Sequence, residues 1–307
     1  MHTEHHHSHH HGHAHSHPRS SYGRAFAVGI ILNTVFIAVE VVYGFISHSL
    51  ALVADAGHNL SDVLGLFLAW AATALGRRAA TERHSYGLKR STVLAALANA
   101  VFLLVAVGAI ILEAIQRFTT PAAIAAETVI WVAMAGIAIN AGTAMMFMSG
   151  RKGDLNIRGA FLHMTADAVI SAGVVAGGLI IMFTGWQWVD PALSLTLSAV
   201  IVYGAGKLLL DSLHLALDAV PEGINAGEVR SYLLGLPSVT DVHHLHIWGL
   251  STTESALTVH LVLANDQRSN ELLHQINHDL HERFGIGHAT IQLETASEVA
   301  CCSENCY

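Results

Sequence analysis

Two copies of one four-residue pattern carry side chains that can bind a metal ion. They are His58-x-x-x-Asp62 and His163-x-x-x-Asp167. A spacing of four places both side chains of a pair on one face of an α-helix. Two such helices packed together would present two imidazoles and two carboxylates to a common centre. This donor set suits a tetrahedral site for a divalent transition metal.

Both patterns lie inside hydrophobic stretches that are long enough to cross a bilayer. Ionisable groups at membrane depth cost roughly 2.5 to 3.5 kcal/mol each on insertion scales. A cation shared between four such groups offsets this penalty. We therefore expect the four side chains to face the interior of a helix bundle and to bind metal.

The composition indicates a membrane protein. The chain is 52% hydrophobic and 12% charged, whereas soluble domains carry about 25% charged residues. A hydrocarbon core of about 30 Å requires roughly 20 apolar residues from a helix. Six stretches meet this requirement, and the predicted spans are residues 26–46, 50–75, 92–115, 128–148, 160–183 and 192–213.

Basic residues in the short loops predict the topology. The three loops on one side together hold only Arg117. The loops on the other side are rich in Lys and Arg, namely Arg77, Arg78, Arg83, Lys89, Arg90, Arg151, Lys152 and Arg158. By the positive-inside rule both termini are cytoplasmic. No secretory signal precedes the first span, so that span is expected to direct its own insertion.

The chain divides into four predicted parts. Residues 1–21 begin with a histidine-rich segment that cannot bury a core, so we expect a disordered cytoplasmic arm that captures metal weakly. An engineered purification tag is the alternative. Residues 22–213 form the transmembrane domain, residues 214–296 a cytosolic domain, and residues 297–307 a tail with Cys301, Cys302 and Cys306. These thiols should stay reduced in the cytosol, where they either bind metal or form a flexible reactive end.

The predicted cytosolic domain is a small α+β unit. A short helix over 225–236 precedes two β-branched runs over 239–248 and 256–263, an amphipathic helix from Leu272 to Phe284 and a last strand over 289–293. An α-β-β-α-β order favours helices packed on a sheet. The core is thin, so dimerisation is expected. From residue 214 onward 12 Asp and Glu face 3 Lys and Arg, a balance that repels nucleic acid and attracts cations, or that only maintains solubility.

Several segments resemble the cation diffusion facilitator family, and most closely its zinc-transporting branch of bacterial efflux proteins. They are residues 49–62, 83–87, 221–224 and 242–248, within a resemblance that runs from Tyr22 to Leu293. The resemblance implies a homodimeric antiporter in membrane lipid that exports a cytosolic divalent metal against protons. It also implies that the cytosolic domain has a ferredoxin-like, metallochaperone-like fold.

Carried over by position, the resemblance makes His58, Asp62, His163 and Asp167 the transport site. The chemistry agrees, because two carboxylates neutralise a divalent ion and two imidazoles favour zinc over manganese or magnesium. Cobalt, cadmium and nickel remain alternatives. Since His and carboxylate ligands must lose protons to bind metal, proton coupling follows from linkage. The expected location is a bacterial inner membrane, with a eukaryotic organelle as the alternative.

The resemblance also indicates a regulatory zinc site in the cytosolic domain. His243 and His260 match metal-binding positions in relatives, and His288 and Glu294 match positions in the related animal branch. Inside the spans, other polar residues either line a cation path or form hydrogen bonds between helices. They are Asn33, Glu40, Asp55, Asn59, Asn99 and Asn140. Asp55 shares a helix face with His58, which favours a role in the path or beside the ligands.

Three other functional classes could involve the same metal-binding residues. A membrane zinc enzyme is disfavoured, because His281-Glu282 is followed by Gly285 where a His-Glu-x-x-His motif needs its second histidine. Four protein ligands would also leave no position for water. We therefore expect no enzymatic activity. A passive metal channel or a membrane metal sensor could use the same four residues, and both remain alternatives.

Overall fold

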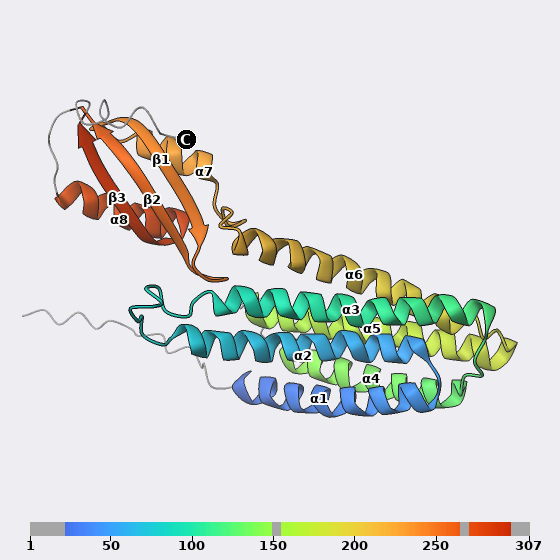
Figure 1. Ribbon diagram of the computed structural model, residues 1–307. Helices are drawn as coiled ribbons and strands as arrows, with labels where there is room; N and C mark the ends of the chain where they lie inside the picture. Colours follow the sequence, from blue (N-terminus) through green and yellow to red (C-terminus); the bar gives the residue numbers. More distant parts are fainter. Residues whose placement is uncertain (1–21, 149–154, 265–269, 296–307) are drawn as a thin grey trace, which may run out of the picture.

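The computed structural model describes residues 22–148, 155–264 and 270–295, which form a helical bundle and a small α+β domain (Figure 1). This confirms the predicted fold class. The histidine-rich segment and Cys301, Cys302 and Cys306 lie outside the described residues. The bundle helices are α1 Tyr22–Ile46, α2 Leu50–Gly76, α3 Ser91–Thr119, α4 Ala126–Phe147, α5 Leu155–Thr184 and α6 Val189–Ala216.

Among the described residues, six helices are long and apolar enough to cross a membrane. Large apolar side chains on the outside of the bundle are exposed, including Val105 at 69% and Phe183 at 80%, as expected of a surface that faces lipid. Several helices extend beyond the predicted spans, for α3 reaches Thr119 and α5 begins at Leu155. The predicted spans stopped short of Arg117 and Arg158 because these residues are charged. Long basic side chains can nevertheless reach the membrane interface from within a helix, so the helices continue past them.

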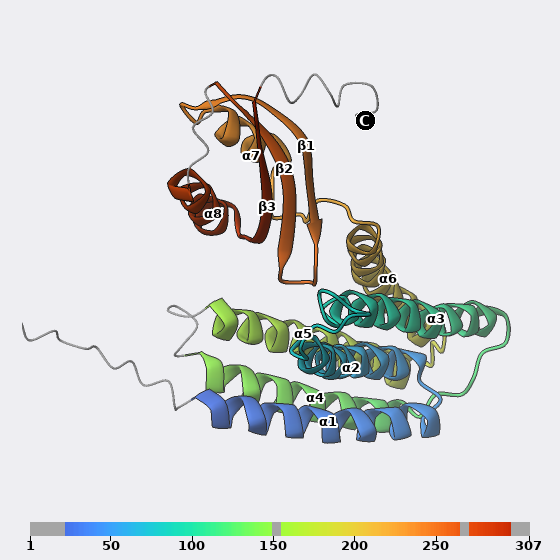
Figure 2. The ribbon, with the colours of Figure 1, turned by 60° about the vertical axis from the view of Figure 1, so that its left-hand side comes forward.

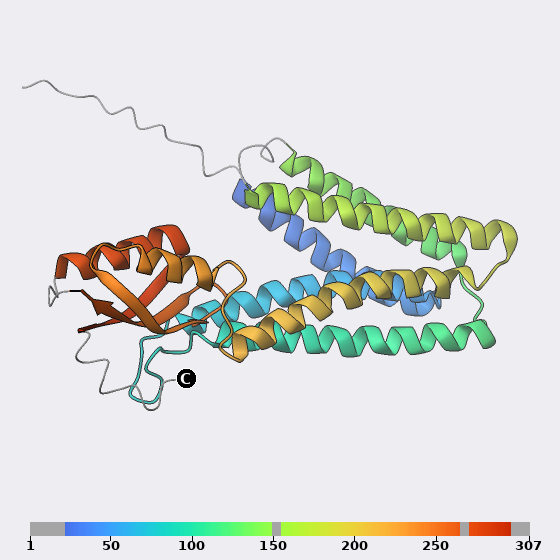
Figure 3. The same cartoon turned by 90° about the horizontal axis from the view of Figure 1, so that it is seen from above.

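Helix α2 is central to the bundle. It contacts α1, α3, α5 and α6. Helix α3 packs on α6 and α4 packs on α5, and Figure 3 shows these two pairs from above. Helices α1 and α4 approach closely, because a Cβ on Gly136 would lie 2.7 Å from Cζ of Phe36. The contact between α2 and α5 allows the two His/Asp pairs to meet.

The start of α2 is fixed by a carboxylate from another helix. Asp190, near the start of α6, accepts hydrogen bonds from the backbone N–H of Leu50 (2.8 Å) and of Ala51 (3.3 Å), and also from the hydroxyl of Ser49. Ser49 itself caps α2 by accepting from the N–H of Leu52. A carboxylate at a helix N-terminus compensates the helix dipole and the unpaired N–H groups. Asp190 thus holds the helix that carries His58 and Asp62.

The C-terminal domain has the predicted α-β-β-α-β order. Its elements are α7 Ala226–Leu234, β1 Val239–Gly249, β2 Ser255–Leu263, α8 Asn270–Phe284 and β3 Ile286–Thr295. The sheet order is β1-β2-β3, with β1 antiparallel to β2 and β2 parallel to β3. Both helices cover one face of the sheet (Figure 2), where Leu233, Leu257, Leu261 and Ile276 are fully buried. No helix among the described residues covers the other face of the sheet.

The loop between α2 and α3 contacts the C-terminal domain. Lys89 Nζ lies 2.5 Å from Glu254 Oε2, and Arg90 pairs with Asp218. The backbone N–H of Thr252 donates to the hydroxyl of Thr92 at 3.1 Å. The basic loop is therefore matched by acidic groups at the end of the bundle that is nearer this domain.

Candidate metal-binding sites

The first candidate site lies between α2 and α5, where the two predicted pairs meet. His58 Nε2 lies 3.8 Å from Asp62 Oδ2 and 3.9 Å from Asp167 Oδ1. His163 Nε2 lies 3.4 Å from Asp62 Oδ2 and 3.6 Å from Asp167 Oδ2. The four side chains thus form a ring in which imidazoles and carboxylates alternate, and we call it the His/Asp ring.

The His/Asp ring is more open than a metal-bound tetrahedron. A zinc ion with ligands at about 2.0 to 2.1 Å would place all ligand atoms about 3.3 to 3.4 Å apart. The four sides of the ring are at or slightly above this distance. The diagonals of the ring, from imidazole to imidazole and from carboxylate to carboxylate, are longer. No three ligand atoms of these four residues all lie within 4.8 Å of one another. A bound ion would therefore draw the side chains inward across the diagonals.

The carboxylates of the His/Asp ring have acceptor atoms to spare. The Asp167 side chain is 2% exposed, and neither of its oxygens accepts a hydrogen bond from a described residue. The same is true of Asp62 Oδ2. A buried carboxylate without donors is unstable unless a cation compensates it. The ring is therefore suited to bind a positive ion.

A cavity of about 410 Å³ reaches the His/Asp ring from one side. Asp62 and His163 line it together with Asn33 and Asn59. Its other lining residues come from the start of α1, the end of α4 and the start of α5, for example Ile30, Phe147 and Ala160. These helix ends lie at the same end of the bundle as the α2–α3 loop (Figure 1). The cavity therefore lies in the half of the bundle nearer the C-terminal domain.

Glu40 and Asp55 lie on the other side of the His/Asp ring and are 0% and 1% exposed. Asn59 Nδ2 donates to Glu40 Oε2 at 3.4 Å, and Ser171 Oγ donates to Asp55 Oδ2 at 3.3 Å. These bonds join α1 to α2 and α2 to α5. Asp55 is thus hydrogen-bonded beside the ring, in the position predicted from its shared face with His58.

The second candidate site lies on the open face of the sheet. His243 Nε2 is 3.0 Å from Glu294 Oε2, and His260 Nδ1 is 2.7 Å from Glu294 Oε1. Strand register explains the meeting. His243 pairs directly with His260, and Glu294 pairs with Val262, which lies two residues beyond His260 on the same face of β2. Ligand atoms of the three side chains all lie within 4.8 Å of one another. Three of the four residues predicted here are therefore brought together.

His288 does not join this cluster within the chain. It precedes Glu294 by six residues on β3, which corresponds to about 20 Å along an extended strand. Its ring instead contacts Tyr86 of the α2–α3 loop, with centroids 5.5 Å apart. The grouping of all four residues was inferred from motif positions, which do not account for distance along the strand.

His244 lies beside the cluster because the backbone is irregular there. Its φ is 49°, and the β1–β2 register shifts between His243 and His246. The ring centroid of His244 is consequently 5.0 Å from that of His260 and 5.2 Å from that of His243. Regular alternation would direct His243 and His244 to opposite faces, so the sequence alone did not predict that His244 lies beside the cluster.

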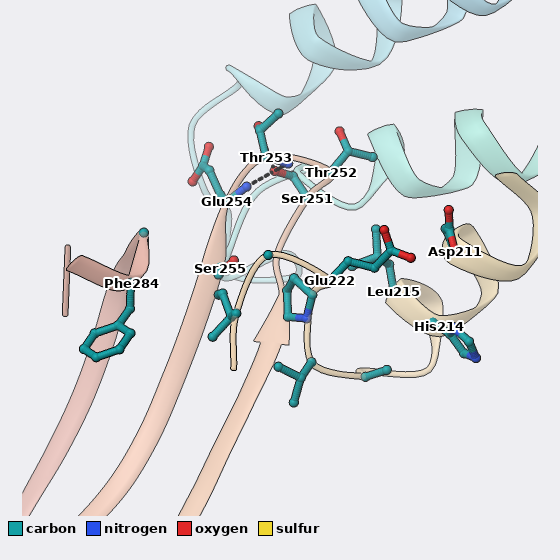
Figure 4. A pocket seen from close by; sticks show the side chains of 16 residues that line it. Asp211, His214, Leu215, Glu222, Ser251, Thr252, Thr253, Glu254, Ser255 and Phe284 are labelled. Atoms are coloured by element: carbon teal, nitrogen blue, oxygen red, sulfur yellow. Dashed lines mark hydrogen bonds between the residues drawn. The ribbon is translucent and has the colours of Figure 1, made fainter. Parts of the chain in front are cut away.

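A further cavity, of about 580 Å³, lies where the end of α6 meets the C-terminal domain (Figure 4). The carboxylates of Asp211, Glu222 and Glu254 line it, beside His214. The hydroxyl of Ser251 accepts from the backbone N–H of Glu254 at 2.9 Å and fixes the β1–β2 turn at its edge. These acidic groups favour cations at the junction of the domains.

Six apolar helices, a partly buried His/Asp ring and a small α+β domain define a multi-pass membrane protein with a candidate metal site at membrane depth. Two family models match the chain, the cation efflux transmembrane domain over residues 26–215 and the cytoplasmic domain of cation efflux proteins over residues 221–296. The chain therefore belongs to the cation efflux, or cation diffusion facilitator, family. Members of this family are transporters.

Similar proteins carry names that refer to metal transport. The metal cation efflux system protein CzcD of Cupriavidus metallidurans is 38% identical over 89% of this chain and 87% of its own length. The cadmium, cobalt and zinc/H(+)-K(+) antiporter of Bacillus subtilis is 34% identical over 89% of both chains. The zinc transporter ZitB of Escherichia coli is 37% identical over 90% of this chain and 89% of its own.

Among solved structures, the metal-bound C-terminal domain of the CzcD transporter from Cuprividus metallidurans matches 23% of this chain and 99% of its own. The identity is 36% and the TM-score is 0.22.

Proposed function

We propose that this protein exports zinc from the cytoplasm in exchange for protons and binds the ion at His58, Asp62, His163 and Asp167. The observation that carries the proposal is the His/Asp ring, in which two imidazoles and two carboxylates alternate at 3.4 to 3.9 Å. Two carboxylates balance the charge of a divalent ion, and two imidazoles favour zinc. Cobalt and cadmium, which appear in the name of the Bacillus relative, are further candidate substrates, as is nickel.

Proton exchange follows from the chemistry of the same ligands. Each imidazole must be neutral and each carboxylate ionised to bind metal, so protons compete with the ion. When the His/Asp ring is open to the side away from the cytoplasm, protonation of His58 or His163 would weaken its binding of the metal ion. The name of the Bacillus relative includes H(+), which supports this coupling.

Loop charge supports an orientation with the C-terminal domain in the cytoplasm. Arg77, Arg78 and Arg83 belong to the loop that contacts this domain. The cavity at His163 would then admit metal from the cytoplasm. We place the protein in a bacterial inner membrane, as its bacterial relatives suggest, and propose a homodimer in which the open faces of the two sheets meet.

The test is zinc flux by purified protein in liposomes, with and without a pH gradient. We expect gradient-dependent flux in the wild type and none in Asp62→Asn or His163→Ala. The matched control is His214→Ala, which changes a histidine outside the ring. Unchanged flux in both ring variants would overturn the site, whereas wild-type flux that ignores the gradient would favour a channel.

We also propose that His243, His260 and Glu294 bind zinc as a regulatory ligand. Their mutual distances support this second role. Zinc there would neutralise acidic charge on the sheet and bias the domain toward one arrangement. If the site is regulatory, His260→Ala should alter the zinc dependence of flux without abolishing flux. A membrane sensor would also depend on this site, but it would carry no flux through the bundle.

A further inference from the structure

A pair of buried carboxylates next to the His/Asp ring has no role in the function proposed so far. Glu40 on α1 and Asp55 on α2 are 0% and 1% exposed. Asn59 binds one oxygen of Glu40, and Ser171 binds one oxygen of Asp55. The four residues come from α1, α2 and α5, and we call them the inner acidic group.

The second oxygen of each carboxyl group has no N–H or neutral hydroxyl donor among the described residues. Glu40 Oε1 and Asp55 Oδ1 are buried and accept no hydrogen bond from a described residue. The two carboxyl groups lie within hydrogen-bonding reach of each other, so two negative charges there would repel, whereas one shared proton would join them. In the described part of the chain, neither forms an ion pair with Lys, Arg or His within 4.0 Å. Two adjacent carboxyl groups at membrane depth are stable only when a proton or a metal cation offsets the repulsion between their charges.

The inner acidic group lies directly beyond the His/Asp ring. Asp55 precedes His58 by three residues on one helix face, and Ser171 follows Asp167 by one helical turn. Glu40 is near the end of α1 and Asp55 near the start of α2, at the end of the bundle away from the C-terminal domain. The cavity at His163 lies toward the other end of the bundle, and of the four residues of the inner acidic group only Asn59 lines it. An ion that entered the ring through the cavity and left it toward the end of the bundle away from the C-terminal domain would therefore meet Glu40 and Asp55 next.

We propose that Glu40 and Asp55 form a second, oxygen-only site that receives the divalent metal from the His/Asp ring before its release. This inference rests on the proposed efflux function. Carboxylate, amide and hydroxyl oxygens bind zinc less tightly than imidazole does. A weaker site after a tighter one divides the release of the ion into smaller steps, as conduction through sequential sites requires.

The experiment measures the modification of each carboxyl group by a hydrophobic carbodiimide in the full-length protein, with peptide mass spectrometry to locate the product. Mn²⁺ and Zn²⁺ are added separately, since Mn²⁺ prefers oxygen ligands. We expect either ion to slow the modification of Glu40 and Asp55 several-fold. Asp190, a buried carboxylate paired with Ser49 and two backbone N–H groups, is the internal control and should react equally with and without metal.

Two variants separate this site from the ring. In His58→Ala/His163→Ala, protection of Glu40 by Mn²⁺ should persist. Its loss would mean that the ion acts only from the ring and would overturn the proposal. In Glu40→Gln, Asp55 should lose its protection. Modification of wild-type Glu40 at the same rate with and without metal would also overturn the proposal and would indicate that the pair holds only a proton.

Zinc flux by the same wild-type preparation distinguishes this inference from the function on which it rests. Flux without protection of Glu40 would overturn the second site alone. Protection without flux would leave the second site supported and contradict export.

Discussion

Asp167 Oδ1 on α5 lies 3.9 Å from Nε2 of His58 on α2, although the two residues belong to different His/Asp pairs. The side chain of Asp167 is 2% exposed, and its oxygens accept no hydrogen bond from the described residues. The ring therefore depends on contacts between the pairs as much as on the spacing within each pair.

Asp167→Asn should abolish high-affinity zinc binding without unfolding the bundle. The amide keeps the shape of the side chain but loses the charge that a divalent ion needs. Loss of residues that only support a ligand weakens metal binding about 10- to 100-fold, so loss of a ligand should exceed about 100-fold. Competition with a zinc-binding dye on purified protein measures the affinity.

Thermal unfolding in detergent is the control for Asp167→Asn. The midpoint should stay the same or rise, because an unpartnered buried charge has been removed. An unfolded variant would make the affinity uninformative. A folded variant with wild-type affinity would show that Asp167 is not a ligand.

The two patterns His58-x-x-x-Asp62 and His163-x-x-x-Asp167 predicted which side chains share a helix face, because helical spacing is a local property. The meeting of the two faces depends on how α2 packs against α5, which spacing alone does not determine. The same limit explains His288, whose position in a motif gave no information about its distance from Glu294 along β3.

Asp190 was not recognised from the sequence as important for the site. The only local signal is an acidic residue at the start of an apolar span, which is common at membrane interfaces. Its role depends on Leu50 and Ser49, which are distant in the chain. Sequence patterns therefore predicted the ring ligands better than the residues that position their helices.

Asp190→Ala should destabilise the bundle. The substitution removes the acceptor for the N–H groups of Leu50 and Ala51 and a charge that lies 3.9 Å from Arg117 Nη1. Loss of a capping acceptor typically costs about 0.5 to 2 kcal/mol. A lower unfolding midpoint in detergent should result. The control is Glu113→Gln, since Glu113 is 49% exposed in its pair with Arg117 and should contribute little. Equal midpoints for the two variants would contradict the role of Asp190.

Tyr232 should make the C-terminal domain less stable in alkali. Its hydroxyl donates to Asp279 Oδ2 at 2.5 Å. Burial is the largest cause that raises the pKa of Tyr232 above its usual value, and the hydrogen bond to Asp279 and the charge of Asp279 raise it further. The folded state therefore holds this proton more tightly than the unfolded state. The stabilisation is complete below the unfolded pKa of about 10 and is lost as pH rises through the higher folded value.

Tyr232→Phe tests this pH dependence. Below pH 9 the variant should be less stable by about 1 kcal/mol, because it lacks the hydrogen bond. Above the unfolded pKa the difference between variant and wild type should shrink. Urea unfolding of the full-length protein at a series of pH values, followed by a signal from the C-terminal domain, measures both effects. A difference that stays constant with pH would show that the Tyr232 proton is not involved.

His260→Ala should remove metal from the cluster on the sheet. His260 Nδ1 is 2.7 Å from Glu294 Oε1 and its ring is 5.1 Å from that of His243, so its loss leaves one histidine and one carboxylate of the three. Co²⁺ is a suitable ion because its visible absorption is strong in four-coordinate sites and weak in octahedral ones. The measurement uses full-length protein that carries His58→Ala/His163→Ala, so that the ring does not contribute. We expect the strong band in this background and its loss with His260→Ala, whereas the control His246→Ala, at an exposed position of the same strand, should retain it. A strong band that survives His260→Ala would exclude the cluster as the binding site.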